Sequence, residues 1–314
     1  MPRILITGAL GQIGTELVPH LRKKYGTDNV VATDIREPSY EFAPFELLDV
    51  TDFGAFENVV KENNIDWIVH NASILSAKGE ENPDLAMNVN IRSIEHALNL
   101  ARKYKLRIFS PSSIAAFGPS TPKDDTPNTT CMRPNTIYGV SKVYGELLGE
   151  YYNFKFGVDY RSLRYPGIIS SEALPGGGTT DYAVEIFYEA LNNGHYTSFL
   201  KKDTALPMMY MPDTLKGTMQ IIEAPSDQLT ERVYNITALS FTPEDLAIAI
   251  QKQIPEFKID YKPDFRQKIA DTWPRSIDDR EAREDWGWSP DFDIDSMTVD
   301  MLTKLREKLN PETN

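Results

Sequence analysis

The glycine-rich turn at Gly8, Gly11 and Gly14 constrains the fold more than any other feature of the sequence. A short apolar run over residues 3–7 precedes this turn, and a helical pattern over residues 12–24 follows it. Glycines at this spacing let the backbone turn tightly, approach a pyrophosphate and pack a helix on a sheet. We therefore expect a buried parallel strand that leads into a dinucleotide-binding helix. The expected contacts of this turn are Gly8, Gly11, Gln12, Ile13 and Gly14.

Asp34 ends the next predicted strand, over residues 30–34, and follows Gly14 by 20 residues. A carboxylate at this place accepts hydrogen bonds from the adenosine ribose, and its charge repels the 2′-phosphate of NADP. The alternative is an ordinary acid in the turn after a strand. NAD is therefore the expected cofactor, although Arg36 two residues later is a feature that would favour NADP.

Strands and helices alternate through the first half of the chain. Further strands are expected over residues 45–48, 67–70, 107–109 and 159–164, and helices over residues 52–63, 83–105 and 138–156. This alternation is typical of an α/β protein with a doubly wound parallel sheet. Ligands bind such sheets at the carboxyl ends of the strands.

Tyr138 and Lys142 lie four residues apart, so a helix places both side chains on one face. A lysine ammonium favours the phenolate, so we expect a lowered pKa for Tyr138 and a role as proton acceptor for an alcohol. The pair alone is weak evidence, because it also arises by chance on solvated helices. A hydroxyl at the end of the preceding strand, on Ser112 or Ser113, is expected to orient the alcohol oxygen.

Composition excludes several classes of partner. The formal net charge is −13, from 33 basic and 46 acidic residues, so neither nucleic acid nor an anionic membrane is an expected partner. Cys131 is the one cysteine, which suits a reducing compartment. We expect no bound metal, because the four histidines lack metal-ligand spacing. No membrane span, signal peptide or Arg-rich leader is recognisable, so a cytoplasmic location is expected.

Four motifs together carry a family resemblance: TGALGQIG with Asp34, HNAS after the fourth strand, SPSSIAAFG after the fifth, and YGVSK. In this order they resemble the extended short-chain dehydrogenase/reductase family over essentially the whole chain. The resemblance implies a Rossmann-like NAD-binding domain over residues 1–165, to which later chain returns, and a smaller C-terminal α/β substrate lobe mainly over residues 166–314. It implies that Tyr138 is the catalytic acid/base and that Lys142 binds the nicotinamide ribose. The catalytic serine falls on Ser112 or Ser113.

The same resemblance implies further contacts and an assembly. Members of the family often form homodimers through their two long helices, here residues 83–105 and 138–156. The cofactor-binding residues implied beyond the glycine-rich turn and Asp34 are Asp49, Val50, Asn71, Ala72, Ser73, Asn90, Tyr138, Lys142, Tyr165, Pro166 and Ile168.

The segment over residues 174–181, LPGGGTTD, resembles a narrower group. Its three consecutive glycines favour a mobile lid, and the alternative is a surface linker. Together with residues 206–213 and 271–288 it resembles the short-chain type of L-threonine 3-dehydrogenases. That resemblance implies NAD-dependent oxidation of L-threonine to 2-amino-3-oxobutanoate. The expected substrate contacts are Ser76, Ser112, Ser113, Tyr138, Gly177, Gly178, Thr179 and Thr180.

Other functions remain open at this point. A sugar-nucleotide epimerase or dehydratase commonly has an asparagine after the sixth strand, where this chain has Tyr165, Pro166 and Gly167. A non-catalytic NAD-sensing protein would have no reason to keep Tyr138, Lys142 and a facing serine. Serine or another 3-hydroxy amino acid fits the same chemistry as threonine. A mitochondrial matrix location is the alternative to the cytoplasm.

Overall fold

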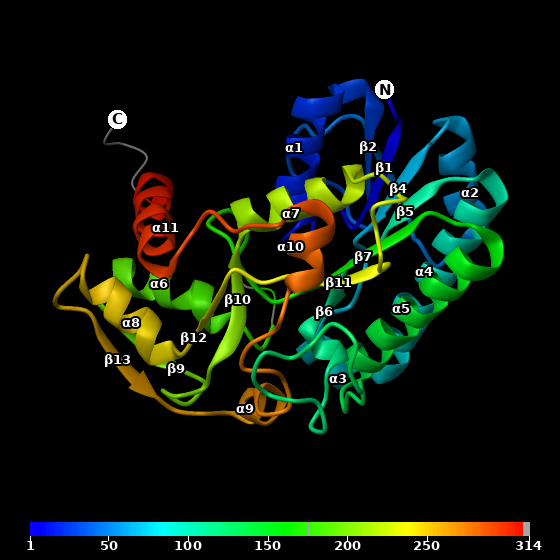
Figure 1. The fold of residues 1–314 in the computed structure, drawn as a ribbon. Coiled ribbons are helices and arrows are strands. Elements are labelled where there is room, and N and C mark those ends of the chain that lie inside the picture. Colours follow the sequence, from blue (N-terminus) through cyan, green and yellow to red (C-terminus); the bar gives the residue numbers. More distant parts are fainter. Residues whose placement is uncertain (175, 177, 310–314) are drawn as a thin grey trace.

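The computed structural model describes residues 1–174, 176 and 178–309, and a large parallel sheet forms its centre (Figure 1). Seven strands follow the order β11-β7-β5-β4-β1-β2-β3, and β6 pairs with β7. The strand order extends to both sides of β1: β2 and β3 lie on one side, and β4, β5, β7 and β11 lie on the other. The strands are β1 (Ile4–Thr7), β2 (Val30–Asp34), β3 (Phe45–Leu47), β4 (Trp67–His70), β5 (Arg107–Phe109), β6 (Ser112–Ser113), β7 (Tyr160–Tyr165) and β11 (Val233–Asn235).

Helices cover both faces of this sheet. On one face α2 (Phe53–Glu62), α4 (Pro83–Tyr104) and α5 (Ile137–Phe156) enclose a core with the sheet. On the other face α1 (Gly14–Tyr25) and α7 (Met211–Glu223) do the same. The predicted α/β, Rossmann-like fold is therefore confirmed.

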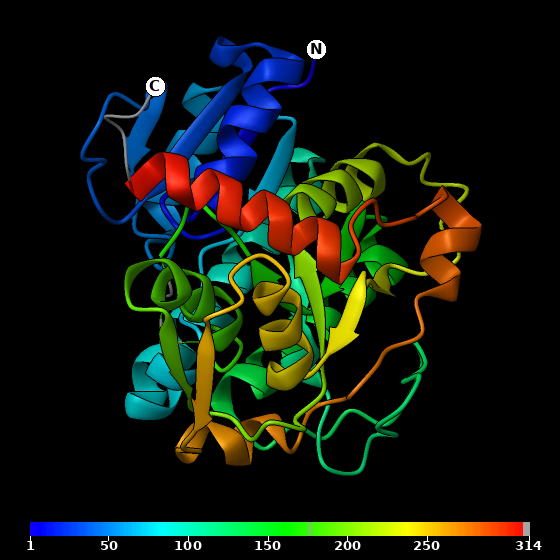
Figure 2. The ribbon, with the colours of Figure 1, turned by 90° about the vertical axis from the view of Figure 1, so that its left-hand side faces the viewer.

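The lobe has a core of its own. A three-stranded sheet joins β12 (Leu239–Phe241), β10 (Leu206–Tyr210) and β8 (Gly167–Ile169), and a second sheet joins β13 (Lys258–Tyr261) and β9 (His195–Ser198). Figure 2 shows α11 (Ile294–Leu309) lying across the lobe, where it packs on α6 (Tyr182–Asn192) and α8 (Pro243–Gln251).

The short helices are α3 (Ser76–Glu81), α9 (Phe265–Ala270), α10 (Arg280–Trp286), η1 (Thr27–Asn29) and η2 (Ile114–Ala116).

The second half of the chain contributes to both parts of the fold. After the lobe strand β10, α7 packs against α1 and β7, and β11 then pairs with β7 at the edge of the large sheet. Helix α7 begins at Met211 and accommodates Pro212 in its first turn, where no N–H is needed. The division into residues 1–165 and 166–314 stays a prediction.

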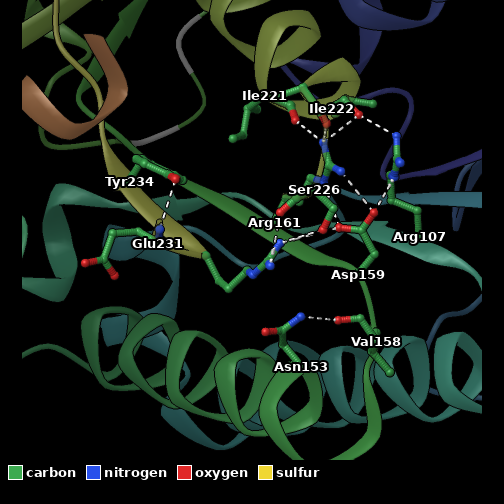
Figure 3. Close-up of polar contacts among 12 residues, drawn as sticks. Arg107, Asn153, Val158, Asp159, Arg161, Ile221, Ile222, Ser226, Glu231 and Tyr234 are labelled. Carbon is green, nitrogen blue, oxygen red and sulfur yellow. Dashed lines mark hydrogen bonds and ion pairs between the residues drawn. The ribbon is translucent and has the colours of Figure 1, made fainter. Parts of the chain in front are cut away.

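The buried guanidinium of Arg161 joins helix α7 to the large sheet (Figure 3). Arg161 on β7 is 0% exposed, and its Nη1 donates to the carbonyl oxygens of Ile221 (2.6 Å), Ile222 (3.0 Å) and Ala224 (2.6 Å). These carbonyls belong to the last turn of α7, where no helical N–H can reach them and the helix dipole is negative. The carboxylate of Asp159 accepts from Nε (2.8 Å) and Nη2 (3.0 Å) of the same guanidinium. Arg161 therefore joins the returning helix to the strand.

Replacing Arg161 by methionine is expected to lower the free energy of unfolding by about 3–5 kcal/mol, because it leaves buried carbonyls and part of a carboxylate unpaired. Urea unfolding measures this loss. Arg232→Met is the matched control, since Arg232 lies 3.9 Å from Asp159 and is partly exposed. That variant should lose less than about 1 kcal/mol. Equal losses in the two variants would contradict the role of Arg161.

Candidate functional site

A cleft with an empty volume of about 1020 Å³ lies at the carboxyl ends of the strands of the large sheet. One wall comes from the glycine-rich turn, the loop after β4, β6 and the first turns of α5. The other wall comes from β8, residues 178–181 and Trp273. The predicted site residues that line the cleft are Gly8, Gly11, Gln12, Ile13, Gly14, Asn71, Ser73, Ser76, Ser112, Ser113, Tyr138, Lys142, Tyr165, Pro166, Ile168, Gly178, Thr179 and Thr180.

The glycine-rich turn leaves no room for side chains. Gly8 has a φ of +63°, and a Cβ on it would lie 2.7 Å from the backbone nitrogen of Ala72. A Cβ on Gly14 would lie 2.5 Å from the carbonyl oxygen of Gly8. The bare backbone therefore forms a cradle at the first turn of α1, which is the geometry that a pyrophosphate requires.

Asp34 is held rigidly beside this turn. Its Oδ2 accepts a hydrogen bond from the backbone N–H of Leu10 (3.0 Å), and its Oδ1 accepts from the backbone N–H and the Nε of Arg36, both at 3.2 Å. The Nη2 of Arg36 donates to the carbonyl of Leu10 (2.9 Å). The arginine that would favour NADP is thus bonded to Asp34 and Leu10.

The side chain of Asn71 fits a polar ligand. Both its Oδ1 and its Nδ2 are buried and make no hydrogen bond to the described residues. A buried amide without partners is costly, so a ligand that satisfies it is stabilised. With the glycine cradle and the strand-end carboxylate, this side chain makes the cleft fit a dinucleotide.

Besides Asp34, four predicted cofactor contacts do not line the cleft. Asn90 is behind the cleft, where its amide bonds to the backbone of Ile74 (2.7 and 3.0 Å) and to the Oγ of Ser141 (3.2 Å), and so joins the β4 loop to α5. Asp49 accepts from the N–H and the hydroxyl of Thr51. Neither it nor the next residue, Val50, lines the cleft. A fourth, Ala72, borders a smaller cavity behind the cleft.

Tyr138, Ser113 and Lys142 meet inside the cleft. The Ser113 side chain lies near enough to the hydroxyl of Tyr138 to influence its ionisation, and both side chains line the cleft. The Nζ of Lys142 lies 5.3 Å from the centroid of the Tyr138 ring and donates to the carbonyl of Pro111 (2.9 Å). Ser112 points to the other side, where its hydroxyl donates to Glu146.

The ionisation of this group is set mainly by burial. Burial raises the pKa of Tyr138 to about 12, against the neighbouring Ser113 side chain, which lowers it. Burial lowers the pKa of Lys142 to about 8, and the carboxylate of Glu146 opposes that fall. The expectation that Lys142 depresses the pKa of Tyr138 is wrong for the protein alone, because its ammonium is directed to the carbonyl of Pro111.

The cleft wall formed by β8 and residues 178–181 carries a hydroxyl without a hydrogen-bond partner among the described residues. This hydroxyl is the Oγ1 of Thr179, a residue that is 1% exposed. Ser76, at the start of α3, is buried on the other wall. The predicted contact Gly177 lies outside the described residues.

Sequence reasoning missed four apolar side chains of the cleft: Leu75, Pro111, Ile114 and Trp273. Trp273 belongs to the aromatic and acidic segment over residues 271–288, which resembles L-threonine 3-dehydrogenases, and this was the available signal. Nothing in the local pattern distinguished Leu75 or Ile114 from core residues.

Comparison with known proteins places the chain in a family. A model described as "NAD dependent epimerase/dehydratase family" matches residues 4–237. The chain belongs to this family. The chain is similar to the crystal structure of an L-threonine dehydrogenase from Phytophthora infestans. The two are 62% identical with a TM-score of 0.97, and the match covers 98% of this chain and 99% of that one.

Two further relatives extend the comparison. A mitochondrial L-threonine 3-dehydrogenase from Bos taurus is 50% identical over 96% of this chain and 82% of its own length. A structure described as a monomeric L-threonine 3-dehydrogenase from a metagenome has 48% identity and a TM-score of 0.95, and covers 98% of this chain and 99% of that one. The prediction that this chain is an NAD-dependent oxidoreductase is thereby confirmed.

Membrane-spanning helices and clusters of metal-ligating side chains are both absent from the described residues. No helix within them is long and apolar enough to cross a membrane. Over residues 1–174, 176 and 178–309, no group of three or more histidine, cysteine or acidic side chains could hold a metal ion.

Proposed function

We propose that this enzyme is an L-threonine 3-dehydrogenase, which converts L-threonine and NAD⁺ to 2-amino-3-oxobutanoate, NADH and a proton. The observation that carries the proposal is the meeting of Tyr138, Ser113 and Lys142 in one cleft with the glycine cradle and the unpaired hydroxyl of Thr179. The relatives named L-threonine dehydrogenase, at 48–62% identity, support the choice of substrate.

Each residue has a distinct part in the proposed reaction. NAD⁺, when bound, would supply a hydride acceptor for C3 of the substrate and a positive charge that favours the phenolate. Ser113 holds the alcohol oxygen, and Tyr138 as phenolate takes the hydroxyl proton. Lys142 binds the ribose and adds a positive charge near the tyrosine. Ser112 takes no direct part, because its hydroxyl is donated to Glu146.

The cofactor is proposed to be NAD rather than NADP. The fixed carboxylate of Asp34 repels a 2′-phosphate, and Arg36 is already bonded to that carboxylate and to Leu10. The amino acid is proposed to lie between Ser76 and Thr179, on opposite walls of the cleft. Residues 176–181 would close over it as a lid, with Gly178 and Thr180 beside it.

Assembly and location complete the proposal. Val140, Leu147, Tyr151 and Phe154 are exposed apolar residues of α5 at spacings that place them on one helix face, and we propose that a second copy covers this face in a homodimer. The relative described as monomeric is the counterexample. The proposed location is the cytoplasm, with the mitochondrial matrix as the alternative.

An assay of the purified protein tests the function. NADH formation, followed by its absorbance, is expected with NAD⁺ and L-threonine, and much less with NADP⁺, L-serine or L-allo-threonine. Nucleotide sugars should give neither NADH nor an epimerised product. Epimerisation of a nucleotide sugar without release of NADH would instead favour the epimerase alternative.

Tyr138→Phe is expected to lower kcat by roughly 10²- to 10⁴-fold, as for the loss of a general base, while NADH binding persists. Ser113→Ala should also lower kcat strongly, because it removes the group that holds the alcohol oxygen. Ser112→Ala is the matched control and should lower kcat less than Ser113→Ala does. Steady-state kinetics and NADH fluorescence titration measure these effects. A larger loss from Ser112→Ala would reassign the catalytic serine.

Thr179→Ala is expected to raise the KM for L-threonine by up to about tenfold, corresponding to one hydrogen bond of roughly 0.5–1.5 kcal/mol. The affinity for NADH should stay nearly unchanged, because the hydroxyl is assigned to the amino acid. Kinetics with each substrate varied in turn decide this. A defect confined to NAD would show that Thr179 does not contact the substrate.

A further inference from the structure

A buried carboxylate lies one helical turn beyond Lys142 on α5. Glu146 is 2% exposed. It accepts a hydrogen bond from the Ser112 hydroxyl, and it accepts three from Arg164 of β7, two from Nε (3.0 and 3.1 Å) and one from Nη2 (2.8 Å). Residues four apart on a helix are neighbours on one face, so this carboxylate and the Lys142 ammonium lie on the same side of α5.

Lys142 and Glu146 border the same small cavity behind the main cleft. Its empty volume is about 350 Å³, and its lining includes Ser112, Ser141 and Asn90. The part of this space that water can occupy is about 20 Å³, enough for roughly one water molecule, so the charge of Glu146 is weakly screened at Lys142. This cavity shares Ser112 and Lys142 with the catalytic cleft and so connects the two spaces.

Apart from Arg164, whose charge is paired with Glu146, the other titratable groups around Lys142 contribute little charge. His70 on β4 is hydrogen-bonded to Thr7 and Ser93, and burial, followed by the charge of Lys142, lowers its pKa to about 3, so it is neutral. Burial raises the pKa of Tyr160 on β7, so this phenol is neutral, and Glu150 lies two helical turns away from Lys142 on α5. From α4, the uncharged Asn90 faces this cavity. Glu146 is the group whose charge opposes the loss of a proton from Lys142.

We propose that Glu146 is a positioning residue for the reaction: its carboxylate, fixed by Arg164 and Ser112, keeps Lys142 charged and in place beneath Tyr138. This proposal rests on the proposed function of the site. It gives Ser112 and Arg164 indirect parts in catalysis, because they hold the carboxylate that acts on the lysine. None of the three contacts the substrate through this arrangement.

The pH dependence of the reaction follows from this arrangement. The pKa of Lys142, about 8, is below that of Tyr138, about 12, so the lysine loses its proton first as pH rises. The active form needs the phenolate together with a charged lysine. Without Glu146 the pKa of Lys142 falls, and the inactive form with a neutral lysine takes over at lower pH. The value of kcat/KM therefore stops rising at a lower pH. Its plateau at high pH falls about tenfold for each pH unit by which the pKa of Lys142 falls.

The test compares pH profiles of kcat/KM for L-threonine in the wild type and in Glu146→Gln. We expect the two profiles to coincide at low pH. In Glu146→Gln the pH at which kcat/KM stops rising, the bend of the profile, should be lower than in the wild type. The plateau of kcat/KM above that pH should be lower by about tenfold for each pH unit of the shift. A lower plateau with an unmoved bend would overturn the proposal, because a purely structural role lowers the rate at every pH.

Two further variants keep the test decisive. Glu146→Gln with Arg164→Gln leaves no unpaired buried charge, so it serves if the single variant fails to fold, and its bend should move in the same direction. Asp159→Asn is the matched control, because it disturbs the buried ion pair of Arg161 at the other end of β7 and should leave the bend in place. A shift of equal size in Asp159→Asn would also overturn the proposal.

Failure of the proposed function is recognised separately. If the wild type does not oxidise L-threonine, the pH dependence of NADH binding, measured by fluorescence, reports the charge of Lys142 through its contact with the ribose. The midpoint should lie at lower pH in Glu146→Gln than in the wild type. An unchanged midpoint would refute the role of Glu146 whatever the substrate is.

Discussion

Two buried arginines on β7 fix the helices on both sides of the large sheet. Successive residues of a strand point to opposite faces, so Arg161 and Arg164, three positions apart, point in opposite directions. Arg161 binds the end of α7, and Arg164 binds Glu146 of α5 and also donates to Asn128 (2.6 Å) and Asn235 (3.1 Å). Burying a guanidinium is costly unless every donor is paired, so each arginine tolerates only one placement of its helix. The proposed catalytic residues of α5 are positioned by this constraint.

The parts of the site that could be predicted from sequence are those that depend on local backbone sterics. Gly8 and Gly14 admit no Cβ, and this exclusion is visible as a spacing of glycines. Asp34 follows from the end of a strand that was predicted with its observed bounds. The choice between Ser112 and Ser113 could not be made, because adjacent strand residues point apart and the sequence does not say which one faces the cleft. The pKa of Tyr138 depends on burial, which no spacing reports.

The lobe was harder to predict because its short strands pair with distant parts of the chain. β10 is central in the order β12-β10-β8 although it contains Pro207, a residue that argues against a central strand. Its five residues are all buried, and this burial by partners from residues 167–169 and 239–241 outweighs the missing N–H. By contrast, the long helices α4 and α5 of the first half were predicted to within one residue of their bounds.

The two walls of the cleft are joined by hydrogen bonds rather than merely facing each other. The Nε2 of Gln12, within the glycine-rich turn, donates to the carbonyl of Ile168 on β8 (3.2 Å). One turn into α1, Glu16 accepts a hydrogen bond from the hydroxyl of Ser170. The chain then runs from Ser170 toward Thr179 on the substrate wall. Gln12 lies in the glycine-rich turn and Glu16 in the helix that follows it, so contacts with the proposed cofactor site set the position of the proposed substrate wall.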